Sequence, residues 1–482
     1  MGIRSGIAWR SKLCELWAID PRALLVFRVG MGLMLLLDLA KRALSFREHY
    51  TADGMFPLEA AKVLEPDSVF FRIYVQSDQP LVQACLFAVA AFLAIFLLLG
   101  YRTRLVSILS FIMLVSLVRR NPFCTHTGDI LLQAMTLWSC FLPLGSVASL
   151  DLRSGRTSRL QRPLVSIGSV AVFMQLIAFY FFAGYFKHRY DVWLRGDALW
   201  VFTNIEEYTR PFGLFLKDYP LPCKVLTYFT LVLEVGAPLL LFSPWRTGVL
   251  RTLAVLLLIG FHLGIQLTVY IGIFEILSIV SVILFLPPVA WDWIQARLPK
   301  GWELSGAQKT QDASVESPTA AARGPVAGTQ LVLSWWFGRI TCAACLVLMW
   351  IGNINSARDE PLPLPKLVHD YGKQLALLQN WNVFSDIENT FYGWFLVLGQ
   401  LEDGRFVDVL EDREFAEVER PAHFASSFVN HNSRRFWRGD GSRTECLVAQ
   451  RRGALPRGVM EPDSRCSAPS PAGLPRGQCS GT

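Results

Sequence analysis

The stretch from Phe181 to Trp200 holds the residues whose types and spacing come nearest to a reaction site. It reads FFAGYFKHRYDVWLRGDALW, an apolar segment that reaches Lys187 three residues after Gly184 and then continues to Trp193. Burial penalises the charged form of an amine, so a lysine held in an apolar pocket can act as a neutral general base. The alternative is a snorkelling lysine, whose ammonium stays in the lipid headgroup layer while its stem lies along the lipid. The residue types alone leave both interpretations open.

Polar residues inside other apolar runs are the next candidates, because an ionisable group within a membrane span is costly unless it is paired or functional. His262 and Gln266 are four residues apart and therefore lie on one face of a helix. Glu234 lies within the apolar run LEVGAPLLLF. We expect these three side chains and Trp193 to shape a substrate cavity around the lysine. A structural alternative pairs Glu234 with Arg28 between two helices.

His126 and Asp129 stand just before a further apolar run, in the sequence RRNPFCTHTGDILL. They are candidates for the same substrate cavity. They also suit the start of a helix, where a carboxylate is stabilised by the positive end of the helix dipole. Cys342 and Cys345 form a CxxC pair, but no second pair of cysteines or histidines completes a metal site, so we expect no metal.

The composition places these residues in a membrane protein. Of the 482 residues, 52% are hydrophobic and only 18% are charged, whereas soluble domains carry about a quarter charged residues. The apolar residues gather in long runs, which is typical of polytopic membrane proteins. The net charge of +7 comes from basic residues in short loops and at segment ends. Since there is no continuous basic face, we expect no nucleic-acid partner.

Nine apolar runs predict spanning helices, and one of them is short, so we expect a mostly α fold: a polytopic membrane bundle of eight or nine spans. The runs cover residues 23–39, 81–100, 104–118, 130–148, 165–185, 225–243, 249–270, 273–290 and 331–352. Arginines gather in three loops, near residues 102–104, 153–162 and 246–251. The positive-inside rule assigns these loops and the N-terminus to the cytoplasm. We expect a multi-pass protein of the bacterial inner or cell membrane.

Composition also divides the chain into parts. The sequence WFLVLGQLEDGRFVDVL, residues 394–410, predicts a β-hairpin because Asp403-Gly404 separates two apolar runs. This hairpin would belong to a small β-containing domain outside the membrane. The expected parts are a cytoplasmic lead-in (1–22), the transmembrane bundle (23–290), a flexible linker (291–330), a last transmembrane helix (331–352), a small exoplasmic domain (353–438) and a disordered or aberrant tail (439–482).

Several stretches in register resemble the horizontally transferred transmembrane (HTTM) family, which includes the vitamin K-dependent gamma-carboxylase and its bacterial relatives. FFAGYFKHRYDVWLRGDAL is similar to the (F/Y)xxxGxxKxxxxxWxxGxA segment of that family. The resemblance covers about residues 20–438. The other similar stretches are LLVFRVGMGLMLLLDLAKR, HYTADGMFP, NPFCTHTGDILLQAMTLWSCFLPLGSVASLD, LEVGAPLLLF, FHLGIQLTVYIGIFEILSIVSVILFLP, LLQNWNVFS and GWFLVLGQLEDGRFVDVL.

The resemblance implies a chemistry in which the lysine matching Lys187 deprotonates reduced vitamin K or another quinol. In the carboxylase the quinol anion reacts with O2, and the strong base formed removes a proton from a glutamate, to which CO2 adds. The resemblance therefore implies O2 and CO2 as co-substrates, membrane lipid or quinone as a partner, and a protein or small-molecule carboxylate as substrate. A quinol can enter such a protein from the bilayer, and a water-poor cavity protects the strong base.

Two departures from the carboxylase narrow this expectation. The carboxylase has a histidine near the position of Gly145 and Ser146, and it has a large lumenal region where this chain has only residues 353–438. We therefore expect a quinol-dependent oxygenase or epoxidase rather than a protein carboxylase. The alternative is a non-enzymatic membrane protein that binds lipid or quinone, or a transporter. In that case Lys187 would lie in the headgroup layer.

Overall fold

The computed structural model describes residues 15–64, 72–205, 208–299 and 329–387, together with three short strands between residues 398 and 414. The described part of the chain is mostly helical, as the apolar runs predict. The longer helices are α2 (Pro21–Ala43), α5 (Pro80–Leu99), α6 (Thr103–Arg120), α7 (Thr127–Ser139), α9 (Ile167–Lys187), α13 (Pro220–Leu241), α14 (Thr247–Thr268), α15 (Phe274–Val282) and α17 (Thr329–Ser356). The shorter ones are α3 (Phe46–Tyr50), α4 (Leu58–Leu64), α8 (Leu150–Arg153), α10 (Asp191–Leu194), α11 (Ala198–Thr203), α12 (Pro211–Leu216), α16 (Pro288–Gln295) and α18 (Lys366–Gln374).

Each of the nine predicted spans falls on one of the longer helices, but fewer of these helices can cross a membrane. Among the described residues, six are long and apolar enough: α2, α5, α9, α13, α14 and the part of α17 from Trp336 to Ser356. The pair Phe274–Phe285 and Pro288–Gln295, bent by 104°, makes a seventh if it is counted as one span. The chain is therefore a multi-pass membrane protein, and the cytoplasmic location of its N-terminus stays a prediction.

The prediction of eight or nine spans is too high for the described residues, and two helices account for the difference. α6 has 18 residues but carries Arg104, Arg119 and Arg120, and the last of these is fully buried within the bundle. α7 has only 13 residues. At about 1.5 Å per residue it is about 20 Å long, whereas the hydrocarbon core of a bilayer is about 30 Å thick. Helix α7 is buried along almost its whole length, whereas Leu105, Ile108 and Leu109 of α6 are exposed.

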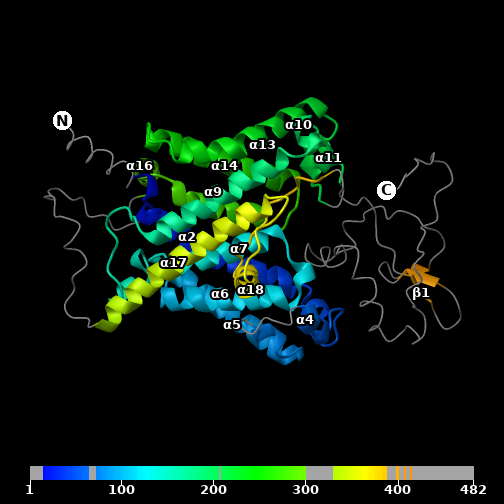
Figure 1. Cartoon of the computed structure of the whole chain (residues 1–482), viewed down its shortest axis with the longest axis horizontal. Helices are drawn as coiled ribbons and strands as arrows, with labels where there is room; N and C mark the ends of the chain where they lie inside the picture. The colour runs from blue at the N-terminus through cyan, green and yellow to red at the C-terminus, as the bar shows by residue number, and fades with distance from the viewer. Residues whose placement is uncertain are drawn as a thin grey trace. The chain divides into compact units, whose positions relative to one another are not determined.

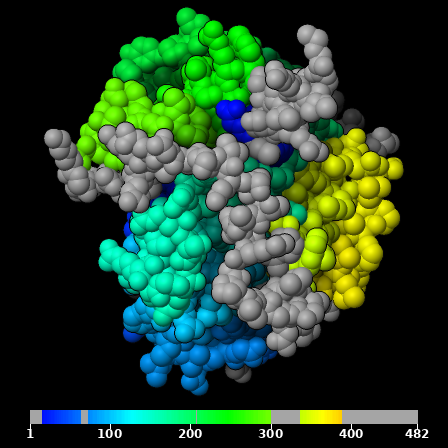
Figure 2. All heavy atoms as spheres, turned by 90° about the vertical axis from the view of Figure 1, so that its left-hand side faces the viewer, coloured from blue at the N-terminus to red at the C-terminus, as the bar shows by residue number. Residues whose placement is uncertain are grey.

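α9 lies at the centre of the bundle. Its most apolar stretch is 72% buried, against 22% for the corresponding stretch of α5. It packs against α13, α17 and α7. Figure 1 shows α9 beneath α13 and α14, with α17 crossing in front of the bundle. The end-on view in Figure 2 places α5 and α6 (blue) opposite α13 and α14 (green), with α17 (yellow) along a third side.

The two ends of α9 are defined by local hydrogen bonds and by a tight turn. At its start, Ser166 Oγ accepts the backbone N–H of Ser169, and Ser169 Oγ accepts that of Ser166, which satisfies two amides at the helix terminus. At its end, Lys187 is followed by the short helix α10 and by Gly196 with φ of 82°. Glycine adopts this left-handed conformation without a Cβ clash. The chain therefore turns back onto the bundle directly after Lys187.

The three strands form an antiparallel sheet in the order β1 (Leu398–Gln400), β2 (Phe406–Asp408) and β3 (Arg413–Glu414). Leu398 pairs with Asp408 and Gln400 with Phe406. Strands β1 and β2 thus stand on either side of the Glu402-Asp403-Gly404 sequence at which the hairpin is predicted. The turn itself, the linker from residue 300 to 328 and the predicted tail (439–482) lie outside the described residues.

Candidate functional site

Lys187 is the last residue of α9, and its side chain is paired inside the bundle. Its Nζ donates a hydrogen bond to Glu234 Oε1 on α13, with the two atoms 2.8 Å apart. Both side chains are only 6% exposed. A snorkelling lysine would instead extend its ammonium to the bundle surface. The geometry favours the buried interpretation of Lys187, and its role as a base stays a prediction.

Two glycines allow the close packing around this pair. A Cβ on Gly184 would lie 3.2 Å from Glu234 Cβ, so the glycine three residues before the lysine lets α9 approach α13. A Cβ on Gly196 would lie 2.9 Å from the Tyr228 ring. The turn at Gly196 follows α10, which places the Trp193 ring 5.2 Å from Lys187 Nζ, within range of a cation–π interaction.

His262 lies in the same region, and it has a partner that the sequence analysis did not identify. Its Nε2 is 2.8 Å from the Tyr180 hydroxyl on α9, and the proton in this hydrogen bond can be on either atom according to the histidine tautomer. His262 is fully buried and lies close enough to Lys187 to interact with it electrostatically. We call the group of Lys187, Glu234, Trp193, Tyr180 and His262 the Lys187 centre.

The Lys187 centre is not fully hydrogen-bonded within the described residues. Glu234 Oε2 and His262 Nδ1 are buried without a hydrogen-bond partner. Gln266, the third member of the predicted polar stripe, also has a buried Oε1 atom without a partner. Since the great majority of buried polar atoms in proteins are bonded, such atoms mark places where a ligand or water can bind. The described part of the chain has no group of three His, Cys, Asp or Glu side chains that could hold a metal ion.

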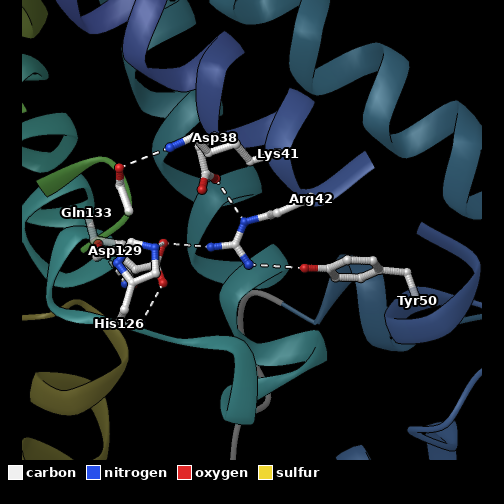
Figure 3. Close-up of polar contacts among 8 residues, drawn as sticks. Asp38, Lys41, Arg42, Tyr50, His126, Asp129 and Gln133 are labelled. Carbon is white, nitrogen blue, oxygen red and sulfur yellow. Dashed lines mark hydrogen bonds and ion pairs between the residues drawn. The ribbon is translucent and has the colours of Figure 1, made fainter. Parts of the chain in front are cut away.

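A second buried polar group lies at the end of α2, and Figure 3 shows it. Arg42 donates from Nε to Asp38 Oδ2 at 2.9 Å, from Nη2 to Asp129 Oδ1 at 2.6 Å and from Nη1 to the Tyr50 hydroxyl at 3.0 Å. All four residues are buried. We call them the Arg42 cluster. One guanidinium thus neutralises two carboxylates that come from different helices.

The structure places His126 and Asp129 with the Arg42 cluster. Asp129 Oδ2 accepts the backbone N–H of His126 at 2.8 Å, which confirms that this pair caps the start of α7. Next along α2, Lys41 Nζ donates to the Gly272 carbonyl at 2.9 Å in the loop between α14 and α15. The hydrogen bonds and ion pairs of Asp129 described above are made with Arg42 and with His126, and Lys187 pairs with Glu234 instead. These two predicted site residues are therefore not brought together with the lysine.

Arg28 does not pair with Glu234, so the structural alternative for these two residues is wrong about the partner. Its Nη1 donates to the carbonyls of Leu144 and Val147 at 2.9 and 2.7 Å, and its Nη2 donates to that of Ala148 at 2.7 Å. The carbonyls belong to the segment after α7, where they would otherwise lack donors. Arg28 therefore has a structural role, which is to anchor this segment against α2.

Comparison with known families identifies a domain that covers both buried groups. Residues 17–293 match the HTTM domain, and this range is more than half of the 482 residues. The matched range includes every residue of the Lys187 centre and of the Arg42 cluster. No curated protein and no solved structure matches the chain.

Proposed function

The chain belongs to the HTTM family, and on that premise we propose that it is a quinol-dependent membrane oxygenase with Lys187 as its base. The substrate in this proposal is reduced vitamin K or another quinol, with O2 as co-substrate. A narrower version resembles the vitamin K-dependent gamma-carboxylase and adds CO2 and a protein or small-molecule carboxylate as substrates. The observation that supports the proposal is the buried position of Lys187 at the end of the most buried span, where Glu234 is placed to stabilise the ammonium that forms once the amine takes up a proton.

The residue types of the Lys187 centre match the hydrogen-bonding groups and the aromatic ring of a quinol. A quinol presents a flat aromatic ring and hydroxyl groups. Tyr180 and Trp193 supply aromatic faces, and both are buried. The unpartnered atoms Glu234 Oε2 and His262 Nδ1 could accept or donate hydrogen bonds to ligand hydroxyls. Tyr180, Glu234 and His262 lie on helices long and apolar enough to cross a membrane, which suits a lipid-soluble substrate.

Proton transfer is the step that these residues would perform. Lys187 Nζ accepts the proton of a substrate hydroxyl, and the ammonium that forms donates to Glu234 Oε1, the acceptor that it already contacts at 2.8 Å. The face of Trp193 adds a cation–π contribution to the same charge. A neutral amine also donates an N–H to Glu234 Oε1, so the contact keeps the lysine in place before and after the transfer. General-base catalysis of this kind contributes about 10²–10⁴-fold to a rate.

Oxygen chemistry follows from the substrate, which supplies two electrons and two protons. In quinol epoxidation one oxygen atom of O2 enters the quinone product and the other leaves as water. The contribution of the bundle is to exclude bulk water from the reacting groups, because Lys187, Glu234 and His262 are all buried.

Mass spectrometry of quinone products tests this proposal. Purified protein in detergent, supplied with reduced quinone and isotopically labelled O2, should form a quinone epoxide that contains one labelled oxygen atom. Lys187→Ala should fold and insert but lower product formation by at least about a hundredfold. Lys62→Ala, at a lysine whose side chain is 44% exposed, is the matched control and should leave the rate unchanged. Full turnover by Lys187→Ala would eliminate the assigned role.

A non-enzymatic membrane protein that binds lipid or quinone is the second candidate. The ion pair itself favours it, because a buried lysine and glutamate can pair for packing alone. On this alternative, the purified protein would bind quinone and form no labelled product. Lys187→Ala would then weaken binding or stability without affecting any reaction.

A further inference from the structure

The segment after α18 packs against the bundle without forming a helix or a strand. Between residues 379 and 387 the side chains alternate, and one face is buried while Asn380 and Asn382 on the other face are exposed. Alternate side chains therefore face the helices, and Phe384 adds a contact from between them. In Figure 1 the yellow trace after α18 runs back along the bundle towards α10 and α11. The buried face consists of Gln379, Trp381, Val383, Ser385 and Ile387.

A pair of glutamines holds the start of this segment against α9. Gln175 Nε2 donates to Gln379 Oε1 at 2.7 Å, and Gln379 Nε2 donates back to Gln175 Oε1 at 2.9 Å. The indole N–H of Trp138 donates to Gln175 Oε1, and that of Trp381 donates to Gln379 Oε1. All four side chains are buried. A fully bonded network of this kind specifies one arrangement, because breaking any member leaves buried polar atoms unpaired.

The far end of the segment contacts the Lys187 centre through Trp193. The Trp193 indole N–H donates to the backbone carbonyls of Phe384 and Ser385 at 3.1 and 3.2 Å. The Phe384 ring packs 4.5 Å from the Phe202 ring of α11. The orientation of the tryptophan that covers Lys187 is therefore set by two carbonyls of this segment.

The backbone of the segment is strained where it enters and near where it ends. Ala376 and Phe384 have φ of 52° and 54°, a region that non-glycine residues occupy at a cost of about 1–3 kcal/mol. Helix α17 passes very close by, since a Cβ on Gly352 would lie 2.7 Å from Leu378 Cα. The backbone preferences of Ala376 and Phe384 do not favour these conformations, so the contacts described above must hold the segment in place.

We propose that residues 379–387 form a wall of the Lys187 centre, in which Gln379 is a positioning residue that keeps Trp193 over the lysine. The proposal assigns a part in the site to a segment that follows the last membrane helix in the sequence. Whether this wall contributes to catalysis rests on the proposed function. The packing of residues 379–387 against the bundle, by contrast, can be measured without an assay of enzyme activity.

Two labelling reactions on purified protein in detergent test the proposal. Ser385→Cys places a thiol on the buried face, and its maleimide labelling is compared by peptide-level mass spectrometry with that of the exposed Cys85. The amine of Lys187 is followed with an acylating reagent in the same samples. Both positions should be protected in Ser385→Cys alone. Adding Gln379→Leu should speed labelling at both positions by about tenfold, the change expected when a buried pair of hydrogen bonds is lost.

Two further variants separate positioning from general damage to the fold. Asn380→Ala, on the exposed face of the segment, is the matched control and should leave both rates unchanged. Gln379→Glu is isosteric and can donate a hydrogen bond only when it is protonated, so it should protect both positions at about pH 5 and lose this protection at about pH 8. The labelling rates of Ser385→Cys alone, measured at each pH, correct for the pH dependence of the two reagents.

The outcomes discriminate between the two proposals. Rapid labelling at position 385 without the Gln379 substitution would show that the segment is not seated and would overturn the inference. Faster labelling at position 385 in Gln379→Leu without faster modification of Lys187 would also overturn it, because the segment would then position nothing at the lysine. Suppose that labelling at position 385 and acylation of Lys187 both become faster with Gln379→Leu, while Lys187→Ala keeps full turnover of quinol. The wall formed by residues 379–387 would then be supported, and only the proposed function would be overturned.

Discussion

The Arg42 cluster and the Lys187 centre are both buried groups of charged and aromatic residues, but they differ in how completely they are bonded. In the Arg42 cluster one guanidinium serves two carboxylates and a phenol, and Asp129 is bonded by a second donor at the start of α7. In the Lys187 centre one amine serves one carboxylate, and Glu234 Oε2 and His262 Nδ1 have no partner among the described residues.

This difference indicates separate roles for the two groups. A saturated network stabilises one arrangement of helices and leaves no polar atom for a ligand. An unsaturated one is costly for folding and is retained where the free atoms serve binding or chemistry. This contrast fits an architectural role for the Arg42 cluster and leaves the Lys187 centre as the site of the proposed function.

The largest expected effect is the loss of stability when the guanidinium is removed. Arg42→Met would leave Asp38 and Asp129 buried side by side without a cation, and breaking such a pair costs about 3–5 kcal/mol. Lys187→Met leaves only Glu234, which can take up a proton, so we expect a loss of about 1–3 kcal/mol. Denaturant titration in detergent micelles measures both free energies of unfolding. Equal losses for the two variants would contradict the distinction between the groups.

A smaller effect concerns His49 beside the Arg42 cluster. Burial, with the nearby charges of Arg42 and Arg120, lowers the pKa of His49 from 6.5 to about 4. Above pH 6.5 the histidine is neutral in both the folded and the unfolded chain. Between pH 6.5 and 4 the unfolded chain binds a proton that folded His49 does not, so stability falls across this window. The difference of about 2.5 pH units amounts to about 3 kcal/mol.

Unfolding measurements from pH 7 to pH 4 check this expectation. Glutamine at position 49 does not titrate, so the stability of His49→Gln should fall less steeply than that of the unsubstituted protein over the same interval. Parallel pH profiles for the two proteins would show that His49 is not the residue responsible.

The positions of the helices could be predicted from the sequence, because apolar runs of the length of a bilayer have few other solutions. Their partners could not. Lys187 and Glu234 were both candidates, but they are 47 residues apart and on different helices, and no local pattern specifies which charges meet. Arg28 shows the same limit, since backbone carbonyls rather than a carboxylate became its partners.

Two further parts of the site were missed for different reasons. Tyr180 lies in an aromatic apolar run, where its hydroxyl is hidden by the hydrophobicity of its neighbours. The segment from Gln379 to Ile387 does alternate buried and outward residues, so a period of two was available as a signal. Its polar residues Gln379 and Ser385 were on the buried face, however, and a pattern based on hydrophobicity alone does not identify a face that contains amides.

The most direct test of the account is the reactivity of the Lys187 amine in the unsubstituted protein. An amine-specific acylating reagent is applied in detergent, and peptide-level mass spectrometry compares Lys187 with the exposed Lys224. The account predicts that Lys187 reacts about two orders of magnitude more slowly, because its amine is buried and bonded to Glu234. Equal rates at the two lysines would place the amine at the surface and contradict the account.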